Sequence, residues 1–282
     1  MLVDMRAIEE LFTENPNGQP IKNAGVSGYR TKTTKAGKQL DVDCYPIFDN
    51  RAARRKLQSA KHQEAQQRVD QRNRWLKLKR LMDANFTEDD VEITLTYKGE
   101  NVSREESGKM LRNYLRKVNR MRDKLGLDKL KYIAVTECAD GDGNEVRLHH
   151  HLVMSGGIDR DTLEGMWVHG MSQTRRLKPD DNGFEGFAKY LCKGAVKHKM
   201  VRQPQVTRWK TFTCSRNLKK PLVSIADKKL SRRRVEKIAA ELPGAAKEVF
   251  EKLYKGYRFL TVDVRMSDQF PGAYIYVRMV RD

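Results

Sequence analysis

The 282-residue sequence has few cysteines and no long apolar run, and both shortages exclude classes of protein. Its four cysteines are scattered and form no CxxC pair, which excludes a disulfide scaffold and a cysteine-rich zinc module. No apolar run approaches the roughly 20 residues of a membrane-spanning helix. The first ten residues, MLVDMRAIEE, lack the basic and apolar regions of a signal peptide. We therefore expect a cytoplasmic protein that does not bind a membrane.

Acidic residues are also scarce relative to basic ones. The chain has 37 Asp and Glu against 56 Lys and Arg, a formal net charge of +19. An excess of this size favours a polyanionic partner, of which DNA, RNA and an anionic membrane are the candidates. Because the sequence has no membrane-spanning segment, nucleic acid is the expected partner.

The middle of the chain has the clearest secondary-structure pattern. Residues 91–97 (VEITLTY), 131–137, 148–154 and 172–177 predict strands, because apolar and β-branched residues recur at strand spacing. A capping box at Ser103–Glu106 opens a helix with apolar residues at helical spacing, and further helices are expected at 161–169 and 183–196. The order predicts an α+β fold with a ferredoxin-like (split βαβ) antiparallel sheet and helices on one face.

The flanking regions extend this core. Residues 51–85 contain no Gly or Pro and predict one long basic helix. Two short strands are expected around Lys35–Gly37, and residues after 230 predict a helical region broken near Pro243 and a closing β-hairpin. We expect three regions: an N-terminal basic region with the long helix (1–86), a core (87–200) and a C-terminal extension of helix and hairpin (201–282).

Two histidines and a glutamate form the first candidate site. Residues two apart in a strand share a face, so His149 and His151 point the same way and His150 points toward the core. If the hairpin turns about Gly143, Glu137 lies opposite His149 on the preceding strand. Two imidazoles and a carboxylate then converge with coordination positions left open, as in a catalytic divalent-metal site. A solvated histidine cluster is the alternative.

A tyrosine and a lysine on the following helix form the second candidate site. Tyr190 and Lys193 lie beside the apolar stripe of the segment GFEGFAKYLCKG, and Gly186 lies one turn earlier. A phenol with an ammonium one turn away suits attack on a phosphodiester. The alternative is a tyrosine that only covers the edge of the core. The same YxxK pattern begins at Tyr114, but that tyrosine lies within its helix's apolar stripe.

Together these motifs resemble the HUH endonucleases (His, bulky hydrophobe, His), and most of all the rolling-circle replication initiators of phages and plasmids. The resemblance rests on VEITLTY, on LHHHLVMSGG with His150 in the hydrophobe's place, and on AKYLCKG, in the family's order. It covers about residues 88–197, and SRNLKKP (215–221) resembles a segment that follows the core in such proteins.

The resemblance implies an activity and a set of partners. His149, His151 and Glu137 would bind Mg²⁺ or Mn²⁺, and Tyr190, assisted by Lys193, would attack single-stranded DNA at a replication origin. The products would be a 5′-phosphotyrosine and a free 3′-OH for a host polymerase. Because no Walker A motif is present, a host helicase is expected as a further partner.

Other interpretations remain open at this stage. A small-molecule enzyme of the cupin type would carry a carboxylate soon after the HxH motif, and none follows here. A non-catalytic DNA- or RNA-binding protein, such as a repressor or a packaging factor, would also use basic residues. The basic residues expected to contact nucleic acid, rather than to form a solvated surface, are Arg54, Arg55, Arg72, Lys79, Arg147, Lys189, Lys219 and Lys220.

Overall fold

The computed structural model describes residues 13–14, 21, 23, 25–48, 63–99, 102–139, 145–192, 212–241, 243–266 and 271–281. The chain divides into two compact units. The first comprises Met1–Asn73, Asp181–Gly183 and Lys220–Asp282, and the second comprises Arg74–Asp180 and Phe184–Lys219. The first unit therefore groups residues from the two flanking regions predicted from the sequence. The region boundaries at 86 and 200 stay a prediction.

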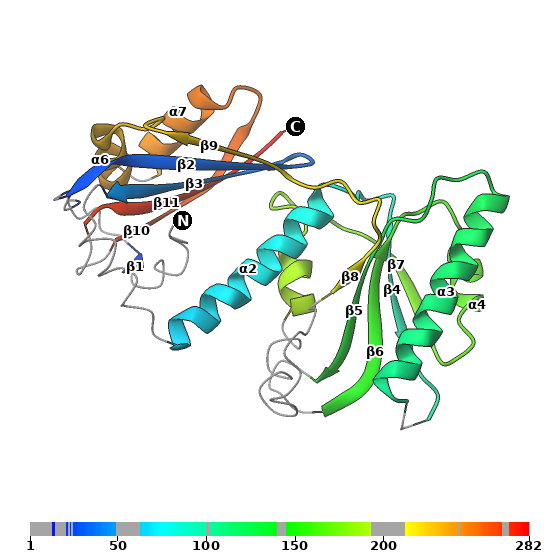
Figure 1. Cartoon of the computed structure of the whole chain (residues 1–282). Helices are drawn as coiled ribbons and strands as arrows, with labels where there is room; N and C mark the ends of the chain where they lie inside the picture. Colours follow the sequence, from blue (N-terminus) through cyan, green and yellow to red (C-terminus); the bar gives the residue numbers. More distant parts are fainter. Residues whose placement is uncertain are drawn as a thin grey trace. The chain divides into compact units, whose positions relative to one another are not determined.

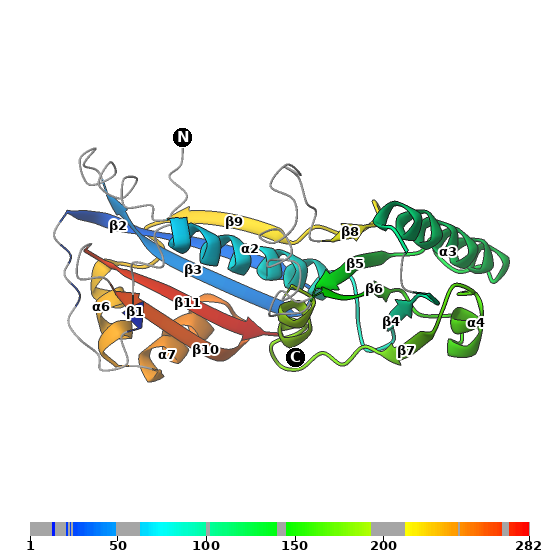
Figure 2. The same cartoon turned by 90° about the horizontal axis from the view of Figure 1, so that it is seen from below.

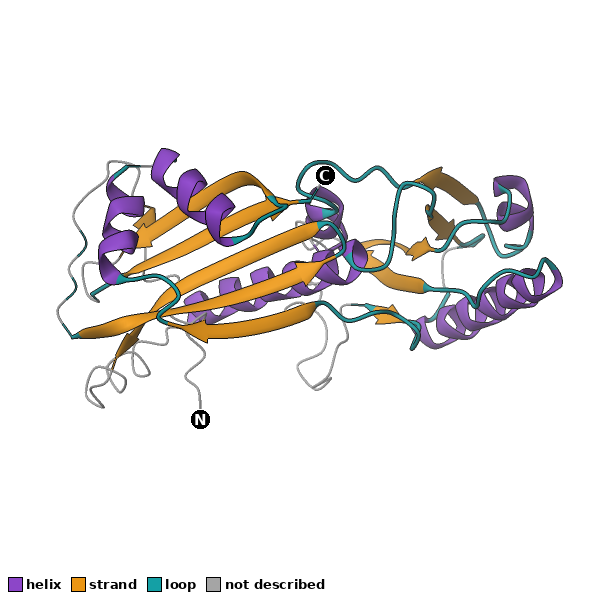
Figure 3. Cartoon of the chain, turned by 90° about the horizontal axis from the view of Figure 1, so that it is seen from above, coloured by secondary structure: helices purple, strands orange, loops and turns teal. Residues whose placement is uncertain are grey.

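A six-stranded antiparallel sheet forms the first unit. Its strands lie side by side in the order β1 (Thr13–Glu14), β10 (Arg258–Met266), β11 (Ala273–Val280), β3 (Gln39–Phe48), β2 (Val26–Ala36) and β9 (Leu222–Asp227) (Figure 2). Helices α6 (Arg232–Ala240) and α7 (Gly244–Leu253) lie on one face (Figure 3). Their apolar side chains share a core with alternate residues of β3, such as Leu40 and Val42.

A five-stranded antiparallel sheet forms the second unit. The order is β7 (Ser172–Arg176), β4 (Val91–Thr96), β6 (Glu145–Met154), β5 (Tyr132–Ala139) and β8 (Thr213–Cys214). Of the four predicted strands, the fourth lies beside the first, then come the third and the second, which is consistent with a ferredoxin-like sheet. Both units have antiparallel sheets, so the predicted α+β class is confirmed.

The two faces of this second sheet have different covers. Helices α3 (Arg104–Lys124) and α4 (Arg160–Gly165) lie on one face (Figure 1), where Ile93, Leu95 and Leu152 pack against the apolar stripe of α3. The sequence predicted helices on one face only. On the other face, the end of α2 (Gln63–Asp83) and a helix at residues 185–192 cover Ile133 and Val135. Only part of that face therefore remains available to a ligand.

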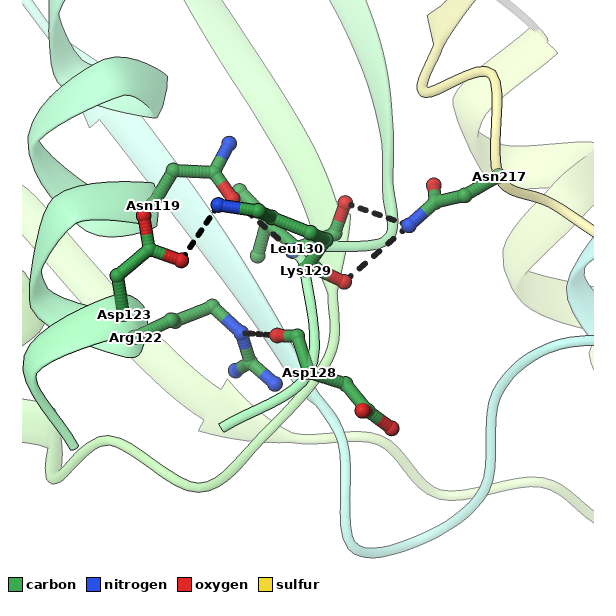
Figure 4. Close-up of polar contacts among 7 residues, drawn as sticks. All are labelled: Asn119, Arg122, Asp123, Asp128, Lys129, Leu130 and Asn217. Carbon is green, nitrogen blue, oxygen red and sulfur yellow. Dashed lines mark hydrogen bonds and ion pairs between the residues drawn. The ribbon is translucent and has the colours of Figure 1, made fainter. Parts of the chain in front are cut away.

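Hydrogen bonds at the start of β5 hold that strand in place. The Asn119 side chain accepts a hydrogen bond from the Leu130 amide, and Arg122 Nε donates to the Asp128 carbonyl at 2.6 Å (Figure 4). Asn217, from the segment after the core, donates to the Leu130 carbonyl at 3.3 Å. The segment that contains β8 is thus tied to the strand that carries Glu137.

The predicted elements agree with the structure in type and differ in extent. The capping box at Ser103–Glu106 and the hairpin turn at Gly37, whose φ is +56°, are confirmed. Helix α4 ends at Gly165, four residues earlier than predicted. Strands β8 and β9 were not predicted; β8 is only two residues long, and every residue of β9 is exposed, so neither has an alternating pattern. In the part of the chain that the structure describes, no helix is long and apolar enough to cross a bilayer.

Candidate active site

The hairpin of β5 and β6 has the register predicted from the sequence. Glu137 pairs with His149, and Val135 pairs with His151. On the other side of β6, Thr94 and Thr96 of β4 pair with His151 and His149. Because side chains alternate along a strand, the two histidines, the glutamate and both threonines share one face of the sheet.

Three side chains on this face converge on one point. The Nε2 atoms of His149 and His151 lie 3.1 Å apart, and they lie 3.1 and 3.3 Å from Glu137 Oε2. All three ligand atoms lie within 4.8 Å of one another. The cluster is partly buried, so it is protected from bulk water and open to a ligand from one side.

The opposite nitrogen of each imidazole is held by a neighbour. His149 Nδ1 lies 2.8 Å from the Arg147 carbonyl oxygen, and His151 Nδ1 lies 3.3 Å from Thr94 Oγ1. A carbonyl oxygen only accepts hydrogen bonds, so Nδ1 of a neutral His149 carries the proton and its Nε2 presents a lone pair to the cluster. Contacts of this kind orient the imidazoles of metal sites.

The charges of the cluster reinforce one another. Burial opposes ionisation of Glu137, but hydrogen bonds from His149 and His151 outweigh it and lower the pKa of the carboxyl to about 2. The hydrogen bond to Glu137 raises the pKa of His149 against the effect of burial. Glu137 is therefore a carboxylate at neutral pH and attracts positive charge to the cluster.

The donor set fits a divalent cation. Two imidazole nitrogens 3.1 Å apart repel one another through their lone pairs unless a proton or a cation lies between them. Two imidazoles and one carboxylate suit Mn²⁺ and related metals, with further positions left for substrate. Among the described residues, Glu137, His149 and His151 are the one cluster of three side chains of metal-ligating type.

His150 points into the core on the opposite face. It is 1% exposed, its Nε2 lies 2.5 Å from the Tyr97 hydroxyl, and its Nδ1 lies 2.9 Å from Thr136 Oγ1. Both nitrogens therefore have protein partners. Burial, aided by the charge of His149, lowers the pKa of His150 to about 4. The structure thus separates His150 from the two histidines of the cluster.

We expect His150 to make stability depend on pH. Its folded pKa of about 4 lies below the ordinary 6.5, so the unfolded chain binds the extra proton between these values and stability falls as pH falls through that window. Between pH 7 and pH 5 the expected loss is ~2 kcal/mol.

The measurement is urea unfolding at pH 7 and pH 5 for the wild-type protein and for His150→Leu. The variant should lose less stability between the two pH values, whatever its stability at pH 7. An equal loss in both proteins would show that His150 is not the group that titrates.

Tyr190 lies beside the cluster on the helix at residues 185–192. Phe184, Ala188 and Leu191 of this segment are buried, as the apolar stripe predicted, whereas Tyr190 is 53% exposed. The Tyr190 ring meets the His151 ring edge to face, with the centroids 5.6 Å apart, and lies parallel to the Phe187 ring at 6.4 Å. The phenol therefore reaches the same space as the cluster.

A groove joins the cluster to Tyr190. It has a volume of about 640 Å³ and includes Thr94, Arg147, His149, His151, Gln173 and Tyr190 in its lining. Histidines from one strand and a tyrosine from a helix 39 residues further along thus face one cavity. Such a groove has room for a phosphodiester between the phenol and the cluster.

Tyr114, the second tyrosine of a YxxK pattern, has a different environment. It is 2% exposed, and its hydroxyl donates a hydrogen bond to the Leu163 carbonyl at 3.2 Å. Burial raises its pKa. It lies with α3 on the face that carries His150, so it does not approach the cluster.

The basic residues predicted to bind nucleic acid have diverse surroundings. Lys79 is 1% exposed and pairs with Asp83 at 2.7 Å; the prediction for Lys79 is therefore wrong, because an ammonium in a buried ion pair cannot reach a phosphate. Arg72 packs over the Tyr276 ring. Lys189 pairs with Glu185 and lies over the Trp75 ring, while it stays about half exposed.

The remaining predicted residues are exposed or undescribed. Arg147 lines the groove and donates a hydrogen bond to the Gly99 carbonyl at 3.0 Å. Lys219 and Lys220 are exposed, and the backbone of Lys219 exchanges two hydrogen bonds with the Asn85 side chain. Arg54, Arg55 and Lys193 lie outside the described residues, so their proposed roles stay predictions.

Sequence reasoning did not identify the residues of β4 and β7 that complete the groove. Thr94 contacts His151 Nδ1, and Gln173 and Arg175 lie one strand further from β6. The alternation of VEITLTY places Thr94 and Thr96 on one face. However, their alignment with the histidines depends on a pairing between strands more than 50 residues apart.

Comparison with known proteins gives one match. Residues 90–198 match the family model for replication-associated protein of the ORF2 type. No curated protein and no solved structure matches the chain. The matched stretch includes Glu137, His149, His151 and Tyr190, so the histidine cluster and the phenol beside it all lie within it. Over this stretch, which holds most of the second unit, the chain is similar to replication-associated proteins, and this similarity supports a role in DNA replication.

Proposed function

We propose that this protein initiates rolling-circle replication by nicking and rejoining single-stranded DNA at an origin through a 5′-phosphotyrosine. The observation that carries the proposal is the position of Tyr190, an exposed phenol whose ring contacts His151 of a three-residue cluster of metal-ligating type. The family match over residues 90–198 supports the same role.

The residues of the groove have separate tasks in this proposal. His149, His151 and Glu137 bind Mg²⁺ or Mn²⁺, and the hydrogen bonds at Nδ1 hold both imidazoles in position. When bound, the cation supplies a Lewis acid that polarises a phosphoryl oxygen. Lys193, one helical turn after Tyr190, assists at the phosphate.

Tyr190 carries out the exchange of bonds. Its phenolic oxygen forms a bond to phosphorus while the bond from phosphorus to the 3′ oxygen breaks. The phenol loses a proton and the 3′ oxygen gains one. One phosphoester replaces another, so the energy of the bond is kept and the reverse reaction rejoins the strand without ATP. A host polymerase extends the free 3′-OH, and a host helicase separates the strands.

The test is formation of a covalent protein–DNA adduct. Single-stranded oligonucleotides that tile the origin of the protein's own replicon are incubated with the purified protein and Mn²⁺, and the products are separated on denaturing gels. We expect an adduct that EDTA prevents. A 3′ label should move with the protein, and a 5′ label should appear on a released fragment that a polymerase extends.

The opposite result would favour the non-catalytic alternative. Tight binding to these oligonucleotides with no adduct on any of them would identify a repressor or a packaging factor. The histidine cluster would then need another explanation.

A further inference from the structure

A second cavity lies next to the groove and is strongly basic. It has a volume of about 580 Å³ and is lined by Arg160, Arg175, Arg176 and Lys178, together with apolar residues. It shares Glu92, Arg175 and Phe187 with the groove. The two cavities therefore meet at these three side chains, and a chain-like ligand can pass from one to the other.

The sheet register gives the direction of this passage. His151 pairs with Thr94, and Thr94 pairs with Gln173 on the edge strand β7, so the three residues form a row across β6, β4 and β7. Arg175 lies two residues from Gln173 on the same face and pairs with Glu92. Neighbouring strands are about 5 Å apart, so β7 lies about 10 Å from β6. A strand of DNA held at the cluster has room for a flanking nucleotide before it reaches Arg175.

Cations exceed anions in this second cavity. Its four basic side chains face a single carboxylate, that of Glu92. Arg176 is 3.9 Å from Asp89, an exposed and distant ion pair that contributes little. Arg175 donates a hydrogen bond to Gln173. In the described part of the chain, Arg160 and Lys178 have no ion pair within 4.0 Å. These cations remain available to an anionic ligand.

An aromatic ring separates the two cavities. Phe187 is partly buried and lines both of them, and its ring is stacked with that of Tyr190. Aromatic rings beside a positively charged groove are the elements with which proteins bind single-stranded nucleic acid without reading its sequence.

We propose that the second cavity binds the nucleotide next to the nicked phosphodiester, with Arg160, Arg175, Arg176 and Lys178 around its phosphate and Phe187 against its base. The proposal deepens the proposed function and rests on it for the identity of the ligand as single-stranded DNA. A cavity of this kind would hold the DNA in register, so that the phosphate to be cut lies between Tyr190 and the cluster.

The alternative is that these residues belong to a generally basic surface. The outer face of α3 offers a matched control, because Arg116, Lys117 and Arg120 are exposed there and α3 covers the opposite face of the sheet. The pair Arg160→Ala and Lys178→Ala can thus be compared with the pair Arg116→Ala and Lys117→Ala, which removes the same charge.

The experiment measures the affinity of the full-length chain for fluorescent oligothymidylates of four to sixteen nucleotides in EDTA, over a series of salt concentrations. We expect the cavity pair to weaken binding about tenfold, and to reduce the slope of log K against log salt by about 0.7 for each phosphate that is no longer neutralised. The α3 pair should change affinity less than twofold. Thermal unfolding checks that both pairs are folded.

Two results would overturn the proposal: equal losses in both pairs, or no loss in the cavity pair. The assay uses no metal, so it is independent of cleavage. A wild-type chain that forms no adduct, with selective loss of affinity in the cavity pair, would refute the nicking activity and keep the binding site. An active wild type whose cavity pair binds DNA normally would do the reverse.

Discussion

Replacing Tyr190 by phenylalanine is expected to abolish the covalent protein–DNA adduct, with a loss of more than ~1000-fold in the rate of nicking, because the variant lacks the only oxygen of that side chain. The ring remains, so its contacts with His151 and Phe187 can persist. Stability should change little, since the side chain is about half exposed. The measurement is the time course of adduct formation with Mn²⁺ on denaturing gels.

Tyr114→Phe is the matched control for this result. The same atom is removed from the other YxxK tyrosine, which lies on the opposite face of the sheet. Loss of the hydrogen bond to the Leu163 carbonyl should cost about 1 kcal/mol of stability and leave nicking intact. An adduct that survives in Tyr190→Phe, or one that is lost in a folded Tyr114→Phe variant, would show that Tyr190 is not the nucleophile.

Replacing both His149 and His151 by alanine is expected to reduce metal-dependent cleavage more than ~100-fold and to leave most of the DNA affinity. The substitution removes two of the three converging ligand atoms. Affinity for DNA depends mainly on contacts to phosphates, which basic side chains elsewhere in the chain supply. Cleavage is followed on gels, binding by fluorescence anisotropy in EDTA, and Mn²⁺ binding by titration calorimetry.

His169→Ala controls for the loss of a histidine as such. His169 is partly buried, and its ring packs against Trp167 rather than against the cluster. This variant should bind Mn²⁺ and cleave DNA like the wild type. Comparable losses of binding and cleavage in the double variant would mean that the two histidines position DNA and do not serve a metal.

Short-range patterns in the sequence were sufficient to place the histidine cluster. In a strand the direction of each side chain follows from its position, so the sequence alone put His149 and His151 on one face and His150 on the other. The predicted pairing of Glu137 with His149 is confirmed, because a hairpin brings together residues equally distant from its turn. The helical stripe through Phe184, Ala188 and Leu191 likewise left Tyr190 at its edge.

Contacts between distant segments were decided only by the tertiary structure. Nothing in the local pattern shows that Tyr190 packs against His151, that Thr94 supports that imidazole, or that Arg160 and Lys178 border one cavity. Lys79 resembles its basic neighbours in sequence, yet it is buried with Asp83. The physical reason is that periodicity determines the direction in which a side chain points from its own helix or strand, whereas its burial and partners depend on which other segments pack against it.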